Sequence, residues 1–108
     1  MGFPTINMVV PEKFDLEHGI YAVWVTLDNL RFKGAMHWGP IPTFDDTNPS
    51  LEVFLLGLEG QDLSSTDTSR IEIDVVERLR EVIKFSSVIE LTTQMEKDVS
   101  NARRVLTE

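Results

Sequence analysis

Cysteine is absent from this 108-residue sequence, which excludes disulfide bonds and zinc sites built on cysteine ligands. Basic side chains are also scarce: 10 lysines and arginines stand against 18 aspartates and glutamates, and the formal net charge is −8 at pH 7. Because nucleic acids and anionic membranes are bound through clustered basic residues, this balance predicts neither as a partner. A polyphosphate remains compatible with an acidic protein, because Mg²⁺ and backbone N–H groups can hold it.

Long apolar runs are missing too. No stretch approaches the ~20 apolar residues that a membrane-spanning helix needs, and the first residues lack the basic segment of a signal peptide. We therefore expect a cytoplasmic protein without a membrane span. The hydrophobic fraction of 42% is ordinary for a globular protein, and the length predicts a single domain over residues 1–108.

The clearest local pattern is a β-hairpin. Residues 20–27 are rich in β-branched and aromatic side chains, and Asp28-Asn29 supplies a two-residue turn. The return strand that follows alternates apolar with polar side chains, as expected for a strand with one buried face. His37 falls on the polar face of this strand, where we expect a solvated imidazole.

Other strands are indicated on either side of loops. Residues 51–56 and 71–75 alternate apolar and polar side chains and predict two strands, whereas residues 76–84 fit either a strand or a helix. Two prolines predict that residues 39–44 have no regular structure.

The C-terminal third has the pattern of one helix. Ser87 followed by Glu90 fits a capping box, in which each side chain bonds a backbone N–H group near the other residue. Apolar residues then follow the i, i+3, i+4 spacing of one buried helix face, at Val88, Leu91, Met95, Val99, Ala102 and Leu106. The patterns together predict a mainly β fold, a small antiparallel domain closed by one C-terminal helix.

Three polar residues are candidates for chemistry. If the N-terminal segment is extended, Thr5 and Asn7 point the same way, about 7 Å apart. Their neutral oxygens can bind a hard cation or a phosphate, although an ordinary edge strand with capping polar groups has the same pattern. Glu52 shares a strand face with apolar side chains, where a carboxylate is costly unless it is paired or solvated. Either a functional role or ordinary contact with solvent would explain a glutamate at this position.

Taken in order, several segments resemble one family. Residues 2–7, Gly-Phe-Pro-Thr-Ile-Asn, resemble the G-F-P-T-A-N motif of riboflavin kinases, which also occurs in the kinase module of bacterial FAD synthetases. The likeness continues in the right order over nearly the whole chain. The matching segments are Gly19 to Val25, Gly39 with Pro42-Thr43-Phe44, Leu51-Glu52-Val53, Leu79-Arg80 and Lys84-Phe85.

The resemblance implies a fold and a reaction. The fold is an antiparallel Greek-key β-barrel of six strands with a C-terminal helix, and the reaction moves the γ-phosphoryl group of ATP to the ribityl 5′-hydroxyl of riboflavin, giving FMN. Carried over to this chain, Gly2, Thr5 and Asn7 bind the nucleotide, and Thr5 and Asn7 also hold Mg²⁺. Glu52 is the general base, and Arg80 contacts the flavin.

This chain also departs from the family pattern. The family has a strand and a glycine-rich segment before the G-F-P-T motif, whereas Met1 directly precedes Gly2 here, and His37 stands where the family has Asn. We therefore expect an exposed sheet edge, which a homodimer could pair. Two alternatives stay open: a non-catalytic relative that binds flavin or nucleotide, and an acidic interaction domain that has lost kinase activity.

Overall fold

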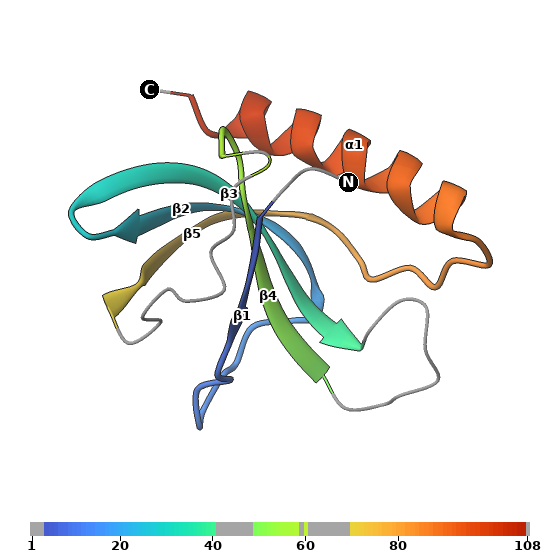
Figure 1. Ribbon diagram of the computed structural model, residues 1–108. Helices are drawn as coiled ribbons and strands as arrows, with labels where there is room; N and C mark the ends of the chain where they lie inside the picture. Colours follow the sequence, from blue (N-terminus) through green and yellow to red (C-terminus); the bar gives the residue numbers. More distant parts are fainter. Residues whose placement is uncertain (1–3, 41–48, 59, 61–69, 108) are drawn as a thin grey trace.

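A computed structural model describes residues 4–40, 49–58, 60 and 70–107. Five strands form one antiparallel sheet, and a C-terminal helix lies across one face of it (Figure 1). In chain order the elements are β1 (Thr5–Met8), β2 (Gly19–Leu27), β3 (Leu30–Pro40), β4 (Pro49–Leu55), β5 (Glu72–Arg80) and α1 (Val88–Val105). Within the described part of the chain, no helix is long and apolar enough to cross a membrane.

The order of the strands is β1-β4-β3-β2-β5. Because β1 lies beside β4, and β4, β3 and β2 follow one another as neighbours, the first four strands form a Greek key. The predicted antiparallel Greek-key fold with a C-terminal helix is therefore confirmed. The sheet is not closed into a barrel: among the described residues, β1 and β5 each pair with one strand and lie at its two edges.

The predicted hairpin is also confirmed. Strands β2 and β3 are joined by Asp28 and Asn29, whose φ angles of 49° and 68° are those of a type I′ turn. Strand β3 runs further than expected, because Gly39 and Pro40 continue it and pair with Ser50 and Pro49. The two prolines face each other at the last pair of the ladder, where a missing N–H group costs little. Residues 41–44 lie outside the described part.

The core of the sheet lies on the face opposite the helix. Alternate residues of β2, β3 and β4 point into it, and Val23, Val25 and Leu55 have no exposed surface at all. Trp38 donates a hydrogen bond from Nε1 to the carbonyl oxygen of Leu16, at 2.8 Å. This bond fixes the loop between β1 and β2 over the core.

The helix packs on the other face through small side chains. Ala22 and Ala35 lie opposite each other on β2 and β3, and both are buried against α1. Because the side chain of alanine is so short, the helix can lie close to the strands. Val99 and Ala102 of the helix and Leu106 at its C-cap are buried against the sheet. Val88 was expected in this stripe, but it is 71% exposed because the first turn of α1 extends beyond the contact with the sheet.

The start of the helix is capped much as predicted. The hydroxyl of Ser87 accepts a hydrogen bond from the backbone N–H of Glu90, at 3.1 Å. The carboxylate of Glu90 reaches back to Ser86 rather than Ser87, and accepts from its backbone N–H and its hydroxyl. The free N–H group of Glu90 in the first turn is thus satisfied locally, which favours a helix start at this point. Residues 76–80, left open by the sequence, belong to β5.

Candidate functional site

A row of five side chains crosses the sheet on the face that carries the helix. The row runs through β1, β4, β3, β2 and β5 and consists of Asn7, Glu52, His37, Ile20 and Arg80, each opposite the next. Residues directly opposite each other in antiparallel strands share a face, with Cβ atoms about 4.5–5.5 Å apart. Folding therefore aligns polar groups that are far apart in the sequence.

The N-terminal candidates lie beside the carboxylate. Asn7 is exposed on β1 and pairs directly with Glu52, and Thr5, also exposed, lies two residues before it on the same face. Their roles at a metal and a nucleotide stay predictions. Gly2, the third predicted nucleotide-binding residue, lies outside the described residues. The geometry thus places one amide and one hydroxyl within reach of a carboxylate.

Glu52 is half-buried on β4, and this burial raises the pKa of its carboxyl above the ordinary value. As expected from the alternation, Phe54 follows on the same face and packs against the helix cluster. Within the described residues no hydrogen bond or ion pair holds the Glu52 carboxyl. A carboxylate with a raised pKa and no fixed partner is suited to accept a proton.

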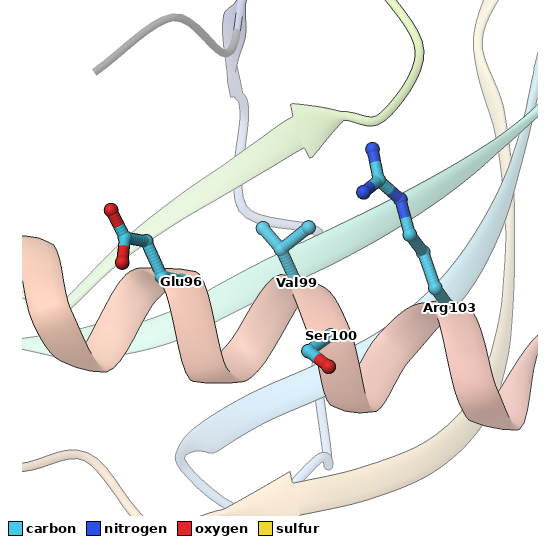
Figure 2. Close-up of a pocket in the computed structure, with 4 residues that line it drawn as sticks. All are labelled: Glu96, Val99, Ser100 and Arg103. Atoms are coloured by element: carbon cyan, nitrogen blue, oxygen red, sulfur yellow. The ribbon is translucent and has the colours of Figure 1, made fainter.

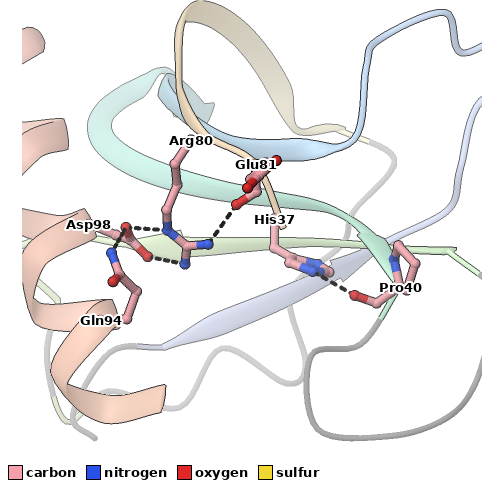
Figure 3. A network of polar contacts seen from close by, with 6 residues as sticks. All are labelled: His37, Pro40, Arg80, Glu81, Gln94 and Asp98. Atoms are coloured by element: carbon pink, nitrogen blue, oxygen red, sulfur yellow. Dashed lines mark hydrogen bonds and ion pairs between the residues drawn. The ribbon is translucent and has the colours of Figure 1, made fainter. Parts of the chain in front are cut away.

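His37 does not behave as the sequence suggested. The prediction of a solvated imidazole is wrong: the residue is only 4% exposed, and it lies on the same face of the sheet as Ala35, the face on which α1 packs. Its Nε2 lies 3.0 Å from the carbonyl oxygen of Pro40 (Figure 3). Burial lowers the pKa of His37; the carbonyl of Pro40 opposes that shift, and the charge of Arg80 adds to it. The ring is therefore neutral at pH 7, and because a carbonyl can only accept, Nε2 carries the proton.

Arg80 links the end of β5 to the helix. Its Nε and Nη2 donate to the two carboxylate oxygens of Asp98, at 2.8 and 2.6 Å, and its Nη1 donates to the carbonyl oxygen of Glu81 (Figure 3). Gln94 adds a bond to the same carboxylate, at 3.1 Å. The two charged side chains are 16% and 7% exposed. The predicted contact of Arg80 with a flavin stays a prediction. The ion pair between Arg80 and Asp98 was not predicted from the sequence.

The side-chain oxygen atoms at the β1 end of the row are of the kind that bind a hard divalent cation. Among the described residues there is no cluster of three His, Cys, Asp or Glu side chains that could hold a metal by itself. Mg²⁺ does not need one, because it accepts one carboxylate or neutral oxygens and keeps water or phosphate at its other positions. The exposed oxygens of Thr5 and Asn7 are ligands of this kind.

A separate hollow of about 290 Å³ lies on the helix. The described residues that line it, all from α1, are Glu96, Val99, Ser100 and Arg103 (Figure 2). None of the residues in the row is among these described lining residues.

The raised pKa of Glu52 makes a testable prediction about stability. A folded-state pKa above the unfolded value of 4.5 means that ionisation of Glu52 disfavours the folded state. The stabilising contribution of the protonated form is complete below pH 4.5 and is lost as the pH rises through the folded-state pKa. Glu52→Gln should therefore gain stability relative to the wild type as the pH rises from 4 to 8. Urea unfolding across this range measures the difference, and a gain that shrinks with pH would contradict the shift.

Comparisons with known proteins show which family the chain is similar to. Residues 1–106 match the family model described as flavokinase, riboflavin kinase. The chain is 33% identical over 104 residues to the bifunctional riboflavin kinase/FMN adenylyltransferase of Haemophilus influenzae, and the match covers 95% of this chain and 32% of that protein. It is also 33% identical over 101 residues to the RNA-binding riboflavin kinase RibR of Bacillus subtilis, with 93% and 42% covered.

Among solved structures, the chain resembles one described as a macrolide-efflux protein from Streptococcus pneumoniae. The TM-score is 0.73 at 25% sequence identity, and the match covers 92% of this chain and 32% of that one. The chain thus spans less than half the length of these three proteins. Because the family model covers nearly all of its residues, this chain belongs to the riboflavin kinase family.

Proposed function

We propose that this chain is a riboflavin kinase, which uses ATP and Mg²⁺ to phosphorylate the ribityl 5′-hydroxyl of riboflavin and gives FMN and ADP. The observation that carries the proposal is the direct pairing of Asn7 with Glu52 across β1 and β4, with Thr5 on the same face. A phosphoryl transfer needs two aligned oxygens, neutralised phosphate charge and one base, and the proposal is supported because a candidate base lies beside two neutral side chains that can bind a charge-neutralising metal.

In this proposal Glu52 takes the proton of the ribityl hydroxyl. The hydroxyl oxygen then bonds to the γ-phosphorus of ATP, the bond from that phosphorus to the bridging oxygen breaks, and ADP leaves with the electron pair. Half-burial suits this role, because it raises the pKa of the carboxyl and so strengthens the base. Within the described residues, no lysine or arginine forms an ion pair with the carboxylate of Glu52.

Thr5 and Asn7 hold the metal and the phosphates. A bound Mg²⁺ neutralises the charge that spreads over the transferring group. The exposed hydroxyl and amide supply neutral oxygens, so they hold the ion without negative charge that would repel a triphosphate, and water and phosphate oxygens fill the other positions of the ion. Gly2 has no side chain to keep the phosphates at a distance. Arg80 lies at the far end of the row, where the isoalloxazine would be bound.

The reaction needs ATP, so we place the protein in the cytoplasm. The small-molecule substrates are its proposed partners, together with a second copy at an open edge of the sheet. The net charge of −8 argues against a nucleic acid, although one relative is named as RNA-binding. The adenylyltransferase activity in the names of other relatives is not part of this proposal.

The test is direct. The purified chain, incubated with riboflavin, ATP and MgCl₂, should release FMN and ADP in equal amounts, measured by chromatography with fluorescence detection. EDTA in excess over Mg²⁺ should stop the reaction. If no FMN appears, a thermal shift distinguishes the alternatives: stabilisation by riboflavin or ADP-Mg²⁺ indicates a binding protein without turnover, and no shift indicates an interaction domain.

A further inference from the structure

Two polar atoms beside Glu52 have no partner in the described structure. They are Nδ1 of His37 and Oγ of Ser50, and both are shielded from solvent. Leaving a buried polar atom without a hydrogen bond destabilises the fold, so most folded proteins satisfy such atoms. Two of them in one place call for a group that the described residues do not supply.

Both atoms belong to the same patch of the sheet. His37 lies directly opposite Glu52, and Ser50 lies two residues before Glu52 on β4, hence on the same face. Ser50 is opposite Gly39, which has no side chain, so it is a diagonal neighbour of His37. The two unpaired atoms therefore flank the carboxylate that the proposed reaction uses as its base.

The chemistry of the two atoms defines what can pair with them. Nε2 of His37 donates to the carbonyl oxygen of Pro40, so Nδ1 of the neutral ring is an acceptor only. It requires an O–H or N–H donor. The hydroxyl of Ser50 can both donate and accept. Neighbouring hydroxyls of a polyol, each a donor and an acceptor, match this pair, whereas a phosphate or a carboxylate offers acceptors alone.

We infer that His37 binds a hydroxyl of the ribityl chain through Nδ1, with Ser50 binding a neighbouring hydroxyl, and that both hold the polyol against Glu52. This inference rests on the proposed function, because it concerns the polyol substrate of the same site. His37 is then a substrate-binding residue and a determinant of specificity. A site with buried hydroxyl partners rejects analogues that lack the hydroxyl, because the partners remain unpaired.

Two substitutions of His37 separate this role from a structural one. The side-chain amide of His37→Asn places an oxygen at the position of Nδ1, whereas that of His37→Gln places an N–H donor at the position of Nε2, where it can still bond Pro40. If Nδ1 binds substrate, His37→Asn keeps the KM for riboflavin near the wild-type value and His37→Gln raises it by roughly three- to tenfold, the size of one neutral hydrogen bond. The KM for ATP should not change in either variant.

A purely structural role gives the opposite order. His37→Gln would then match the wild type in KM and Tm, and His37→Asn would lose stability; this result overturns the inference. Ser50→Ala is the second variant, with an expected rise of the same size in the KM for riboflavin and an unchanged Tm. His18→Gln and Ser100→Ala, at exposed positions, are the matched controls and should behave as the wild type.

Binding measurements separate this inference from the kinase proposal. If the wild-type chain makes no FMN, the Kd for riboflavin is measured by fluorescence quenching in the same variants. A higher Kd for His37→Gln and Ser50→Ala, but not for His37→Asn, supports the binding of ribityl hydroxyls by His37 and Ser50, even though the kinase proposal has failed. Equal Kd values in all variants, or no binding of riboflavin by the wild type, overturn it.

Discussion

Glu52→Gln is expected to lower kcat for FMN formation by roughly 10²- to 10⁴-fold, the usual contribution of a positioned general base. The amide has the size and shape of the carboxyl but cannot take the ribityl proton. Because it is neutral, it also avoids the cost of burying a charge, so the variant should fold at least as well as the wild type at pH 7. The KM for ATP should stay close to the wild-type value, since the amide still fills the same space.

The pH dependence gives a second readout of the same substitution. In the wild type, kcat/KM should rise as the pH passes the raised pKa of Glu52, because the carboxylate forms there. The residual activity of Glu52→Gln should not show this rise with pH. Glu72→Gln, at an exposed position on β5, is the matched control and should keep full activity. A Glu52→Gln variant within about threefold of the wild type would show that another group takes the proton.

Asp98→Ala is expected to destabilise the fold by about 3 kcal/mol, the lower end of the cost of breaking a buried ion pair. The substitution leaves the guanidinium of Arg80 without its two-bond partner in a setting where that side chain is only 16% exposed. Gln94 loses a partner as well. In a domain of this size each kcal/mol lowers the Tm by roughly 4–8 °C. Urea denaturation and thermal unfolding followed by circular dichroism measure both quantities.

The controls for this substitution test the cause of the loss. Asp74→Ala removes an exposed aspartate from β5 and should change the stability by less than about 0.5 kcal/mol. The double variant Arg80→Met with Asp98→Leu removes both charges and should recover much of the loss, because no charge stays buried without a partner. A loss below about 1 kcal/mol for Asp98→Ala would mean that the pair behaves as an exposed one.

Features that depend on neighbouring residues could be predicted from the sequence. The Asp28-Asn29 turn defines a hairpin because both residues accept a positive φ, and Ser87 defines the helix start because its hydroxyl can cap the first turn. The alternation around Glu52 also placed its carboxylate on a face with apolar side chains, and that face packs against the helix. Each of these patterns is complete within a few residues.

Features that depend on distant residues could not be predicted in this way. The pairing of Asn7 with Glu52 requires β1 to lie beside β4, which local periodicity does not specify, and only the family resemblance implied it. The polar face of β3 looked solvated because the residues near His37 in the sequence do not indicate that this position is buried in the fold. The bond between Arg80 and Asp98 joins β5 to α1, and neither residue has a local pattern that points to the other.

Among the described residues, the two edge strands of the sheet, β1 and β5, differ in a way that affects the behaviour of the protein at high concentration. Strand β5 carries exposed acidic side chains at Glu72, Asp74 and Glu77, and its pairing with β2 shifts register twice. Like charges and bulges on an edge strand oppose pairing with a second copy. Self-association in solution should therefore use β1 rather than β5, whose acidic side chains oppose the approach of a second copy.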